Sequence, residues 1–393
     1  MSDFFDNPHP ILAELRERGG LSPDATTGSL ISTSHGDVCA ILKHRELSKD
    51  PRKLPADDPL RAKLVGKEPG WQPNLLFLDP PDHTRLRALV TRAFTPRRIE
   101  TLAPRIETMA RALLDGVAGR ASFDLLDALA RPLPIQVIGE LIGVDVAAVP
   151  AFADWCKAMS HELNPMAPPE ALRLAAEARA AFDAHVRASM DERRQSPRDD
   201  LLTALLEAGE AGDRLSEAEL VSMCRILLLA GNITTTDAIA NGVLALLDHP
   251  AELARLRADR GLIDRAVEEM LRYDSSVTGV GRNVVERPVE VAGRTMPPGT
   301  RLHASLAGAN RDPAVFPEPD RFMIERDANP HVAFGGGIHF CLGAPLARLE
   351  MKLAIGMLVE RFPRIRLAVP RQSLEWQRIV YFRALKQLPI AVD

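Results

Sequence analysis

The chain has 393 residues, of which 46% are hydrophobic and 26% charged, a composition typical of a soluble globular protein with a deep core. Its net charge of −4 at pH 7 argues against a nucleic-acid-binding protein that relies on bulk positive charge. The four cysteines lie far apart and form no C-x-x-C pair, so neither a disulfide framework nor a structural zinc site is expected. The first ten residues lack a secretory signal, and no apolar run approaches the ~18 residues of a membrane span, so we expect a cytoplasmic protein that binds no membrane.

The first part of the chain is expected to be helical, with one long loop. Helical spacing predicts a short helix over Pro10–Arg18, which two glycines end, and another over Asp37–Lys43. Residues 49–75 are rich in Pro, Asp, Lys and Gly and predict a long loop. The next helix begins within DPPDHTRLR, where Asp79 is the candidate cap because an N-cap carboxylate accepts from the unpaired N–H groups of the first turn.

The middle of the chain predicts further helices. Helical spacing continues over Arg98–Val117, and Pro169–Glu207 predicts two surface-facing helices that are broken around Gln195–Pro197. The stretch Ser216–Glu219 is a capping box, S-x-x-E, and the helix that it opens meets no proline until Pro250. At ~1.5 Å per residue, such a helix is about 48 Å long.

The centre of this long helix has an unusual composition. It reads AGNITTTD, from Ala230 to Asp237, between flanks that are apolar enough to be buried. Gly costs a helix interior about 1 kcal/mol relative to Ala, and β-branched Thr is a mediocre helix former. A stretch this weak in a buried helix indicates a position where something other than helix stability is selected.

The C-terminal half combines helices with β structure. A helix is predicted around Asp264–Tyr273, and the last long helix begins after Cys341. Alternating β-branched and polar residues with Gly and Pro turns predict β-rich portions near 30–35, 283–305 and 365–393. The expected fold is therefore mainly α with minor β, in a single domain over residues 1–393.

The strongest chemical signal is FGGGIHFCLG, from Phe334 to Gly343. Three successive glycines let a backbone approach a large flat group closely. Cys341 precedes a predicted helix, whose first-turn N–H groups and dipole stabilise a thiolate. A lone cysteine would more often be an inert buried thiol, but the pattern F-x-x-G-x-x-x-C-x-G before a helix favours a ligand. Cys39, Cys156 and Cys224 lack such a context and are interpreted as small hydrophobic residues.

This segment resembles the heme-binding loop of the cytochromes P-450, the heme-thiolate monooxygenases, and other motifs of that family follow in the right order over nearly the whole chain. The resemblance implies the cytochrome P-450 fold, with heme b between the long distal helix and the loop that carries Cys341, the proximal iron ligand. A thiolate on heme iron favours cleavage of the O–O bond. The resemblance also implies cofactor contacts at His83, Arg87, Ala230, Gly231, Arg282, Phe334, Gly335, His339 and Gly343.

A second motif of the family is E-x-x-R, which occurs here as Glu269 and Arg272. Two such residues at i and i+3 on a helix would ordinarily form a solvated surface pair. Followed by RDPAVFPEPDRF, they resemble the family's buried triad, with Arg321 as the third member. The resemblance implies a structural role for this triad, which braces the heme-binding core.

The distal helix departs from the family at one position. The pattern Ala-Gly-x-acid-Thr-Thr reads Ala230, Gly231, Asn232, Ile233, Thr234 and Thr235 here, so isoleucine stands where the family usually has a proton-relaying acid. Three routes remain open: water with Thr234 alone, Asp237 as a substitute acid one helical turn on, or hydrogen peroxide, which already brings both protons. Asn232 is a weaker candidate, since a neutral amide orients water but does not donate as an acid does.

The resemblance implies a monooxygenase that inserts one oxygen atom of dioxygen into an apolar small molecule, with electrons from a separate ferredoxin and reductase. Two alternatives stay open, a peroxide-driven peroxygenase and a heme protein that binds a ligand without turnover. We expect a monomer whose substrate cavity includes the segments Ser275–Gly281 and Ile379–Tyr381. A basic surface suited to an acidic electron donor is expected at Arg85, Arg92, Arg97, Arg98, Arg348 and Lys352.

Overall fold

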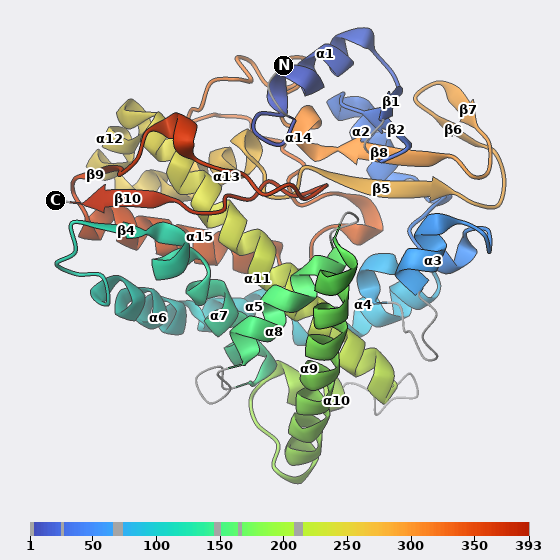
Figure 1. The fold of residues 1–393 in the computed structure, drawn as a ribbon, viewed down its shortest axis with the longest axis horizontal. Coiled ribbons are helices and arrows are strands. Elements are labelled where there is room, and N and C mark those ends of the chain that lie inside the picture. Colours follow the sequence, from blue (N-terminus) through green and yellow to red (C-terminus); the bar gives the residue numbers. More distant parts are fainter. Residues whose placement is uncertain are drawn as a thin grey trace. The chain divides into compact units, whose positions relative to one another are not determined.

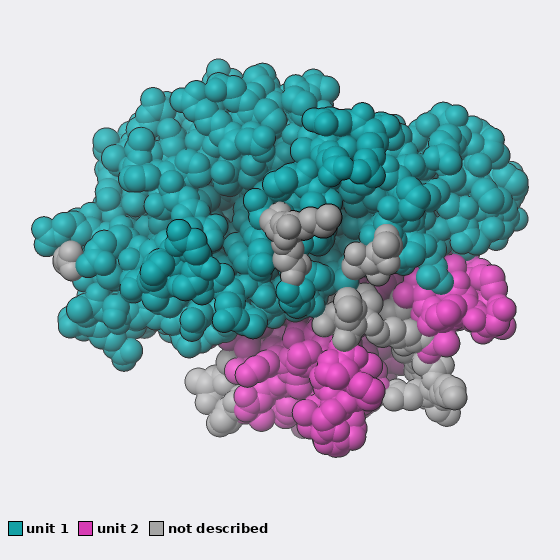
Figure 2. Space-filling view, turned by 45° about the horizontal axis from the view of Figure 1, so that its top comes forward, with its two compact units in different colours: residues 1–47, 103–133, 234–393 teal, residues 48–102, 134–233 magenta. Residues whose placement is uncertain are grey.

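The computed structural model describes residues 4–24, 27–65, 74–144, 151–163, 167–207 and 215–392, and Figure 1 labels its helices and strands. Two compact units are present, each assembled from separate stretches of the chain (Figure 2). Unit 1 comprises Met1–Leu47, Ala103–Leu133 and Thr234–Asp393, and unit 2 comprises Ser48–Leu102 and Pro134–Ile233. Most of the described residues are helical, which confirms the prediction of a mainly α fold with minor β.

Unit 1 holds the β structure and the helices next to it. Its helices are α1 (His9–Arg18), α2 (His35–Lys43), α6 (Ala103–Asp115), α12 (Pro250–Ala258), α13 (Ile263–Tyr273), α14 (Leu306–Ala309) and α15 (Ala344–Arg361). Its strands are β1 (Ser22–Asp24), β2 (Ser29–Ser32), β4 (Ser122–Asp124), β5 (Gly279–Val284), β6 (Val289–Val291), β7 (Arg294–Met296), β8 (Arg301–Ser305), β9 (Ile365–Leu367) and β10 (Pro389–Val392), and β3 (Leu47–Ser48) lies where the chain passes into unit 2. Strands β2, β5 to β8, β9 and β10 overlap the three predicted β-rich portions.

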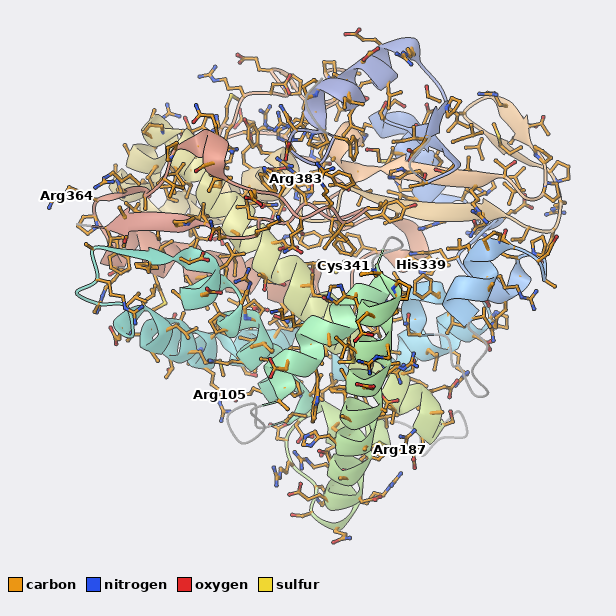
Figure 3. All side chains as sticks on the ribbon, viewed as in Figure 1. Arg105, Arg187, His339, Cys341, Arg364 and Arg383 are labelled. Atoms are coloured by element: carbon orange, nitrogen blue, oxygen red, sulfur yellow. The ribbon has the colours of Figure 1, made fainter. Side chains whose placement is uncertain are left out.

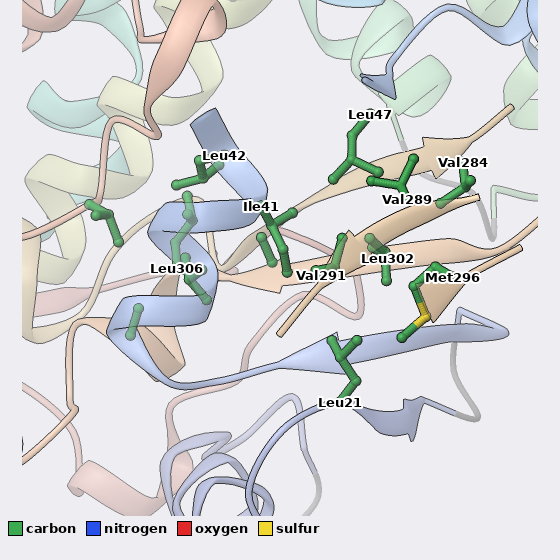
Figure 4. Close-up of a cluster of buried hydrophobic side chains, with 14 residues drawn as sticks. Leu21, Ile41, Leu42, Leu47, Val284, Val289, Val291, Met296, Leu302 and Leu306 are labelled. Atoms are coloured by element: carbon green, nitrogen blue, oxygen red, sulfur yellow. The ribbon is translucent and has the colours of Figure 1, made fainter. Parts of the chain in front are cut away.

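The largest sheet places distant segments of sequence side by side. Strand β2 is parallel to β8, and β8 is antiparallel to β5, as Figure 1 shows. Strand β10 pairs with both β4 and β9, which ties the C-terminal strand to residues 122–124. A core of aliphatic side chains lies between α2 and strands β5 to β8 (Figure 4), and its central members are Ile41, Leu42, Val284, Val291, Leu302 and Leu306. Burying such side chains, at about 25 cal/mol per Å² of apolar surface, holds α2 on the sheet.

Unit 2 is helical in its described residues. Its helices are α3 (Pro59–Val65), α4 (Asp82–Ala93), α5 (Pro96–Thr101), α7 (Pro132–Ile142, which begins in the last two residues of the preceding stretch of unit 1), α8 (Phe152–Met159), α9 (Pro169–Gln195) and α10 (Leu201–Glu207). Helix α9 packs against α8 and α10. The predicted break between α9 and α10 is confirmed, but α10 does not face solvent as expected, because Leu201, Leu202 and Leu205 are buried.

Helix α11 (Glu217–Asp248) belongs to unit 2 up to Ile233 and to unit 1 from Thr234. It has 32 residues, which agrees with the expected length of about 48 Å. The capping box is formed: the Ser216 backbone N–H donates to Glu219 Oε2 at 2.8 Å, and the Glu219 N–H donates to Ser216 Oγ at 3.2 Å. By length and composition alone, α11 is the one helix among the described residues that is able to cross a membrane. Half of its most apolar 18-residue stretch is buried inside the protein. The core helix of a soluble protein can have the same length and composition.

Two local predictions for the region before α4 are wrong. The segment expected as a loop over 49–75 contains a 3₁₀ turn (Pro51–Lys53) and helix α3, while residues 66–73 lie outside the described part. Asp79 does not cap α4, which begins at Asp82. The reason is that the Asp79 carboxylate already accepts from Ser48 Oγ at 2.5 Å and the Lys49 backbone N–H at 2.9 Å.

Candidate active site

The loop Phe334–Gly343 is closed on itself immediately before α15. The Cys341 backbone N–H donates to the Phe334 carbonyl at 3.0 Å, and Gly343 is the N-cap residue of α15. Gly335 and Gly337 have φ angles of 72° and 66°, in the left-handed region that favours glycine. A side chain on Gly337 would overlap the Leu42 carbonyl of α2, so the loop packs directly on that helix. The glycines therefore fix the path by which the chain presents Cys341.

Cys341 differs from the other cysteines in its surroundings. It is half-buried and lies two residues before the α15 N-cap, where the first-turn N–H groups and the helix dipole favour an anion. Burial raises the pKa of the Cys156 and Cys224 thiols to about 12, and it also raises the pKa of the Cys39 thiol. A thiol with a raised pKa is a poor nucleophile and a poor ligand at neutral pH, which agrees with the interpretation of these three as structural residues.

The start of the loop is braced by a network that the sequence did not indicate. The Arg348 guanidinium lies 4.5 Å from the centre of the Phe334 ring, and its Nε and Nη2 donate to Glu268 at 2.6 and 2.8 Å. His331 Nε2 lies 3.1 Å from the same carboxylate. Burial alone would raise the pKa of Glu268, but the hydrogen bonds from Arg348 and His331 outweigh it and lower this pKa to about 2. Helix α13 thereby holds both α15 and the first residue of the cysteine loop.

The E-x-x-R brace is present, but its third member is not Arg321. Arg272 donates to Glu269 at 2.7 and 2.8 Å, and both side chains are fully buried. Arg326 Nε donates to Glu269 Oε2 at 3.0 Å with a side chain that is 4% exposed, whereas the Arg321 side chain is 63% exposed and pairs with Glu318. Arg321 contributes only its carbonyl, which accepts from Arg272 Nη2 at 3.2 Å. Arg326 therefore takes the buried position that the resemblance assigned to Arg321.

Two predicted anion-binding side chains lie in unit 1. Arg282 is buried on β5, and its Nη1 donates to the Gly281 carbonyl at 2.9 Å. His339 is half-buried in a single 3₁₀ turn (Gly337–His339), two residues before Cys341, and both residues are labelled in Figure 3. The structure therefore brings His339, Phe334, Gly335, Cys341 and Gly343 together on one loop.

The other predicted pair lies on α4 in unit 2. His83 is buried and Arg87 is half-buried, one helical turn apart. Burial, followed by the positive charge of Arg87, lowers the pKa of His83 to about 4, so the imidazole is neutral at neutral pH. A neutral imidazole still donates one N–H, and Arg87 supplies the charge that an anionic group requires.

The centre of α11 is accessible, although the helix is continuous there. Ala230 is exposed and Gly231–Thr234 are half-buried, while Thr235, Thr236 and Asp237 are buried. On the unit 2 side, a side-chain carbon on Gly231 would come within 3.3 Å of the Ile138 side chain of α7, so only a very small residue fits. Only the first part of the weak stretch, Ala230 to Thr234, is thus open at the surface of the helix.

Asp237 is a buried acid, with its side chain 4% exposed. Its Oδ2 has no hydrogen-bond partner among the described residues. Burial raises the pKa of Asp237 well above its usual range, and the charge of Arg131 offsets this only in part. Burial therefore favours the protonated form of this carboxyl. Asn232 also has a buried Oδ1 that finds no partner in the described part of the chain.

The expected basic surface is largely neutralised by acidic neighbours. Arg348 pairs with Glu268, Lys352 Nζ with Asp264 Oδ2 at 2.9 Å, and, in unit 2, Arg98 with Asp199 at 2.8 Å and Arg85 with Glu219. The Arg92 side chain lies outside the described residues. Ile338 and Phe340, on the loop beside Cys341, are instead 51% and 43% exposed.

The sequence profile described as cytochrome P-450 matches residues 151–381 of this chain. The chain belongs to the cytochrome P-450 family. It is 44% identical to cytochrome P-450 107B1 of Saccharopolyspora erythraea, over 91% of this chain and 88% of that protein. It is 40% identical to the vitamin D(3) 25-hydroxylase of Pseudonocardia autotrophica, over 99% of this chain and 94% of that protein. The structure of the myxobacterial CYP267B1 in complex with myristic acid matches with a TM-score of 0.91 and 40% identity, over 99% of this chain and 97% of that one.

These matches confirm the family and the fold that the sequence indicated. The chain is a bacterial-type cytochrome P-450, an oxygen-incorporating oxidoreductase, and the family implies a heme-iron cofactor. The residues of unit 1 fit such a group: Cys341 offers a thiolate, Gly335 has open space where a side chain would stand, and Arg282 is a cation for carboxylates.

Proposed function

We propose that this cytochrome P-450 binds heme b through Cys341 and inserts one oxygen atom of dioxygen into a bulky apolar small molecule. The observation that carries the proposal is the closed loop before α15. The Cys341 N–H to Phe334 carbonyl bond and two left-handed glycines hold the sulfur at a helix N-terminus, where a thiolate is favoured. When bound, the heme supplies the iron at which dioxygen is reduced, and a thiolate ligand favours cleavage of the O–O bond.

The remaining residues are assigned to holding the cofactor. Arg282 and His339 bind carboxylates of the heme as cation and N–H donor, and His83 and Arg87 do the same from α4. Room for the flat macrocycle comes from four residues with little or no side chain, Ala230, Gly231, Gly335 and Gly343. The Phe334 ring is assigned to contact with the macrocycle. The 393 residues act as one heme domain, which is a cytoplasmic monomer.

Proton delivery is assigned to Thr234 and Asp237. Thr234 is half-buried in the accessible turn of α11, where its hydroxyl would hold a water molecule for proton transfer. Burial raises the pKa of Asp237 and so favours its protonated form, which is the form that can donate a proton. Ile233 provides no proton, which makes Asp237 the replacement for the missing acid.

We propose a separate ferredoxin, with its reductase, as the electron donor. It contacts the surface around Cys341, where exposed Ile338 and Phe340 lie near paired charges, and buried apolar contact there adds to electrostatic steering. Ile233 also supports a second candidate, a peroxygenase that uses hydrogen peroxide and needs no proton relay.

The relatives support a bulky apolar substrate. One is named a vitamin D(3) 25-hydroxylase, and the structure of another holds myristic acid. In this chain the segment Ser275–Gly281 carries only small or β-branched side chains, which leaves volume for such a molecule.

The deciding experiment is the spectrum of the reduced carbon monoxide complex. The wild-type protein is expected to show the Soret band of a thiolate-ligated heme, and Cys341→Ser to lose it. Cys39→Ser is the matched control, because Cys39 is equally half-buried but lies on α2 outside the loop. Absence of the thiolate band in the wild type contradicts the proposal. Turnover of a panel of lipids is then measured with ferredoxin, reductase and NADH, and separately with hydrogen peroxide, which distinguishes the two enzyme reactions. If the protein turns over no lipid under either condition, the result favours a ligand-binding protein.

A further inference from the structure

Tyr381 has a strained backbone that its surroundings hold in place. Its φ is 70°, in the left-handed region that bulky residues avoid, and such strain persists only where neighbouring contacts determine it. The Thr278 backbone N–H donates to the Tyr381 carbonyl at 2.8 Å, and the Arg383 N–H donates to the Ser276 carbonyl at 2.8 Å. The turn that carries Tyr381 is thereby bonded along the segment Ser275–Gly281.

The Tyr381 ring rests on His303 of β8. The two rings meet edge to face, with centroids 4.9 Å apart and an interplanar angle of 88°. His303 is buried, and its Nδ1 lies 3.1 Å from Asp24 Oδ2 at the end of β1. Thr27 Oγ1 donates to the same carboxylate at 2.6 Å and is hydrogen-bonded to the Tyr381 hydroxyl. The hairpin of β1 and β2 therefore fixes both rings.

His303 fills the space beside Gly279 of β5 that a side chain at that position would need. A Cβ on Gly279 would overlap His303 Nε2, and this nitrogen is buried with no hydrogen-bond partner among the described residues. Nδ1 is hydrogen-bonded to Asp24, whereas the Nε2 side of the ring only packs against the backbone at Gly279. Gly281, two residues on, has the Tyr381 hydroxyl 3.9 Å from its Cβ position, which is ordinary contact distance.

We propose that His303, held by Asp24 and seated on Gly279, is a positioning residue that sets the place of the Tyr381 turn and so the shape of the substrate-facing segment Ser275–Gly281. This inference rests on the proposed function, because that segment is assigned to the substrate cavity there. The same segment continues through β5 to Arg282, so a shift of the Tyr381 turn changes the cavity wall on the way to a proposed heme contact.

A matched pair of glycine variants tests the proposal. Gly279→Ala displaces His303, whereas Gly281→Ala on the same strand meets only ordinary contact. Hydrogen exchange of the Thr278 and Arg383 amides, whose bonds join the turn to the segment, is expected to accelerate in Gly279→Ala and to stay at the wild-type rate in Gly281→Ala. His303→Gln, which keeps a donor for Asp24 but removes the ring, is expected to act as Gly279→Ala does, and it decides the test if Gly279→Ala does not fold.

The consequence for specificity is measured with imidazole and phenylimidazole, which bind heme iron and differ by one ring. The ratio of their dissociation constants is expected to change by about tenfold in Gly279→Ala and His303→Gln, within the range of a modest change in pocket shape. Imidazole affinity and the thiolate band of the carbon monoxide complex should stay unchanged. The proposal is overturned if amide exchange and the affinity ratio of the variants equal those of the wild type. Loss of the thiolate band in the wild type would instead contradict the proposed function.

Discussion

Arg326, not Arg321, completes the buried cluster around Glu269: its Nε donates to Glu269 Oε2 at 3.0 Å, beside Arg272. Its other nitrogens donate to the Pro317 carbonyl at 2.7 Å and the Arg321 carbonyl at 2.9 Å. The cluster therefore ties α13 to the segment that leads to the cysteine loop through one carboxylate and two guanidinium groups.

We predict that Arg326→Gln destabilises the protein strongly. Arg272 still compensates the Glu269 charge in this variant, but the hydrogen bonds to Glu269 and to the Pro317 and Arg321 carbonyls are lost. A buried acceptor that loses its donor costs about 1–3 kcal/mol. Arg321→Gln removes only an exposed pair with Glu318 and should cost less than ~1 kcal/mol. Urea unfolding of the two variants, followed by circular dichroism, measures the difference. Equal losses for both arginines would contradict the assignment of Arg326.

A second prediction concerns the brace on Phe334. Arg348→Lys keeps the charge but loses the two-point bond to Glu268 and the flat contact with the Phe334 ring. The loop should loosen, and the thiolate form of the carbon monoxide complex should convert several times faster to an inactive form. The rate of loss of the thiolate band in mild urea measures this.

Lys352→Gln is the control for this experiment. Lys352 lies on the same helix, and its partner Asp264 is largely exposed, so the pair should contribute little. The Lys352→Gln variant should lose the thiolate band in mild urea at the same rate as the wild type. If Arg348→Lys behaves as this control does, the guanidinium does not brace the loop.

The sequence predicts features that depend on residues close together in the chain better than features that depend on residues far apart in it. The capping box at Ser216 and the helix that begins after Cys341 depend on neighbouring residues, and the structure confirms both predictions. Asp79 is engaged by Ser48, about thirty residues away, and Arg348 by Glu268, eighty residues away, and no local pattern indicates such pairs. The prediction of Arg321 as the third member of the triad was wrong because Arg321 and Arg326 both lie more than fifty residues after Glu269, and no local pattern decides which of them reaches it.

A third prediction tests the proton donor. Asp237→Asn removes the proton of a buried carboxyl while keeping its size, so turnover driven by ferredoxin should fall about 10²-fold or more, in the range of a lost general acid. Reducing equivalents should be diverted to hydrogen peroxide. Peroxide-driven turnover should be unaffected, because peroxide brings its own protons. Unchanged coupling, measured as product per NADH, would exclude Asp237 from the relay.

Ile233 gives the complementary experiment. Ile233→Glu restores an acid at the half-buried position where the family usually carries one, and Ile233→Gln has the same size without the proton. If water and Thr234 limit proton delivery, only Ile233→Glu should raise product per NADH. A gain in both variants would point to pocket shape rather than to a relay.

The last prediction concerns the pH dependence of stability and rests on Glu350. This side chain of α15 is buried, its Oε2 has no partner among the described residues, and burial raises its pKa well above the usual range. The folded state therefore favours the protonated carboxyl more than the unfolded state does. The fold loses no stability through Glu350 below the unfolded pKa, and loses it progressively as pH rises from there toward the folded pKa.

Glu350→Gln should consequently stabilise the protein at about pH 8 and change little at about pH 4, as urea unfolding at both values would show. Glu360→Gln, which alters an exposed residue of the same helix, should show no such pH dependence. A destabilisation by Glu350→Gln at the higher pH would mean that Glu350 is ionised and paired in the folded protein.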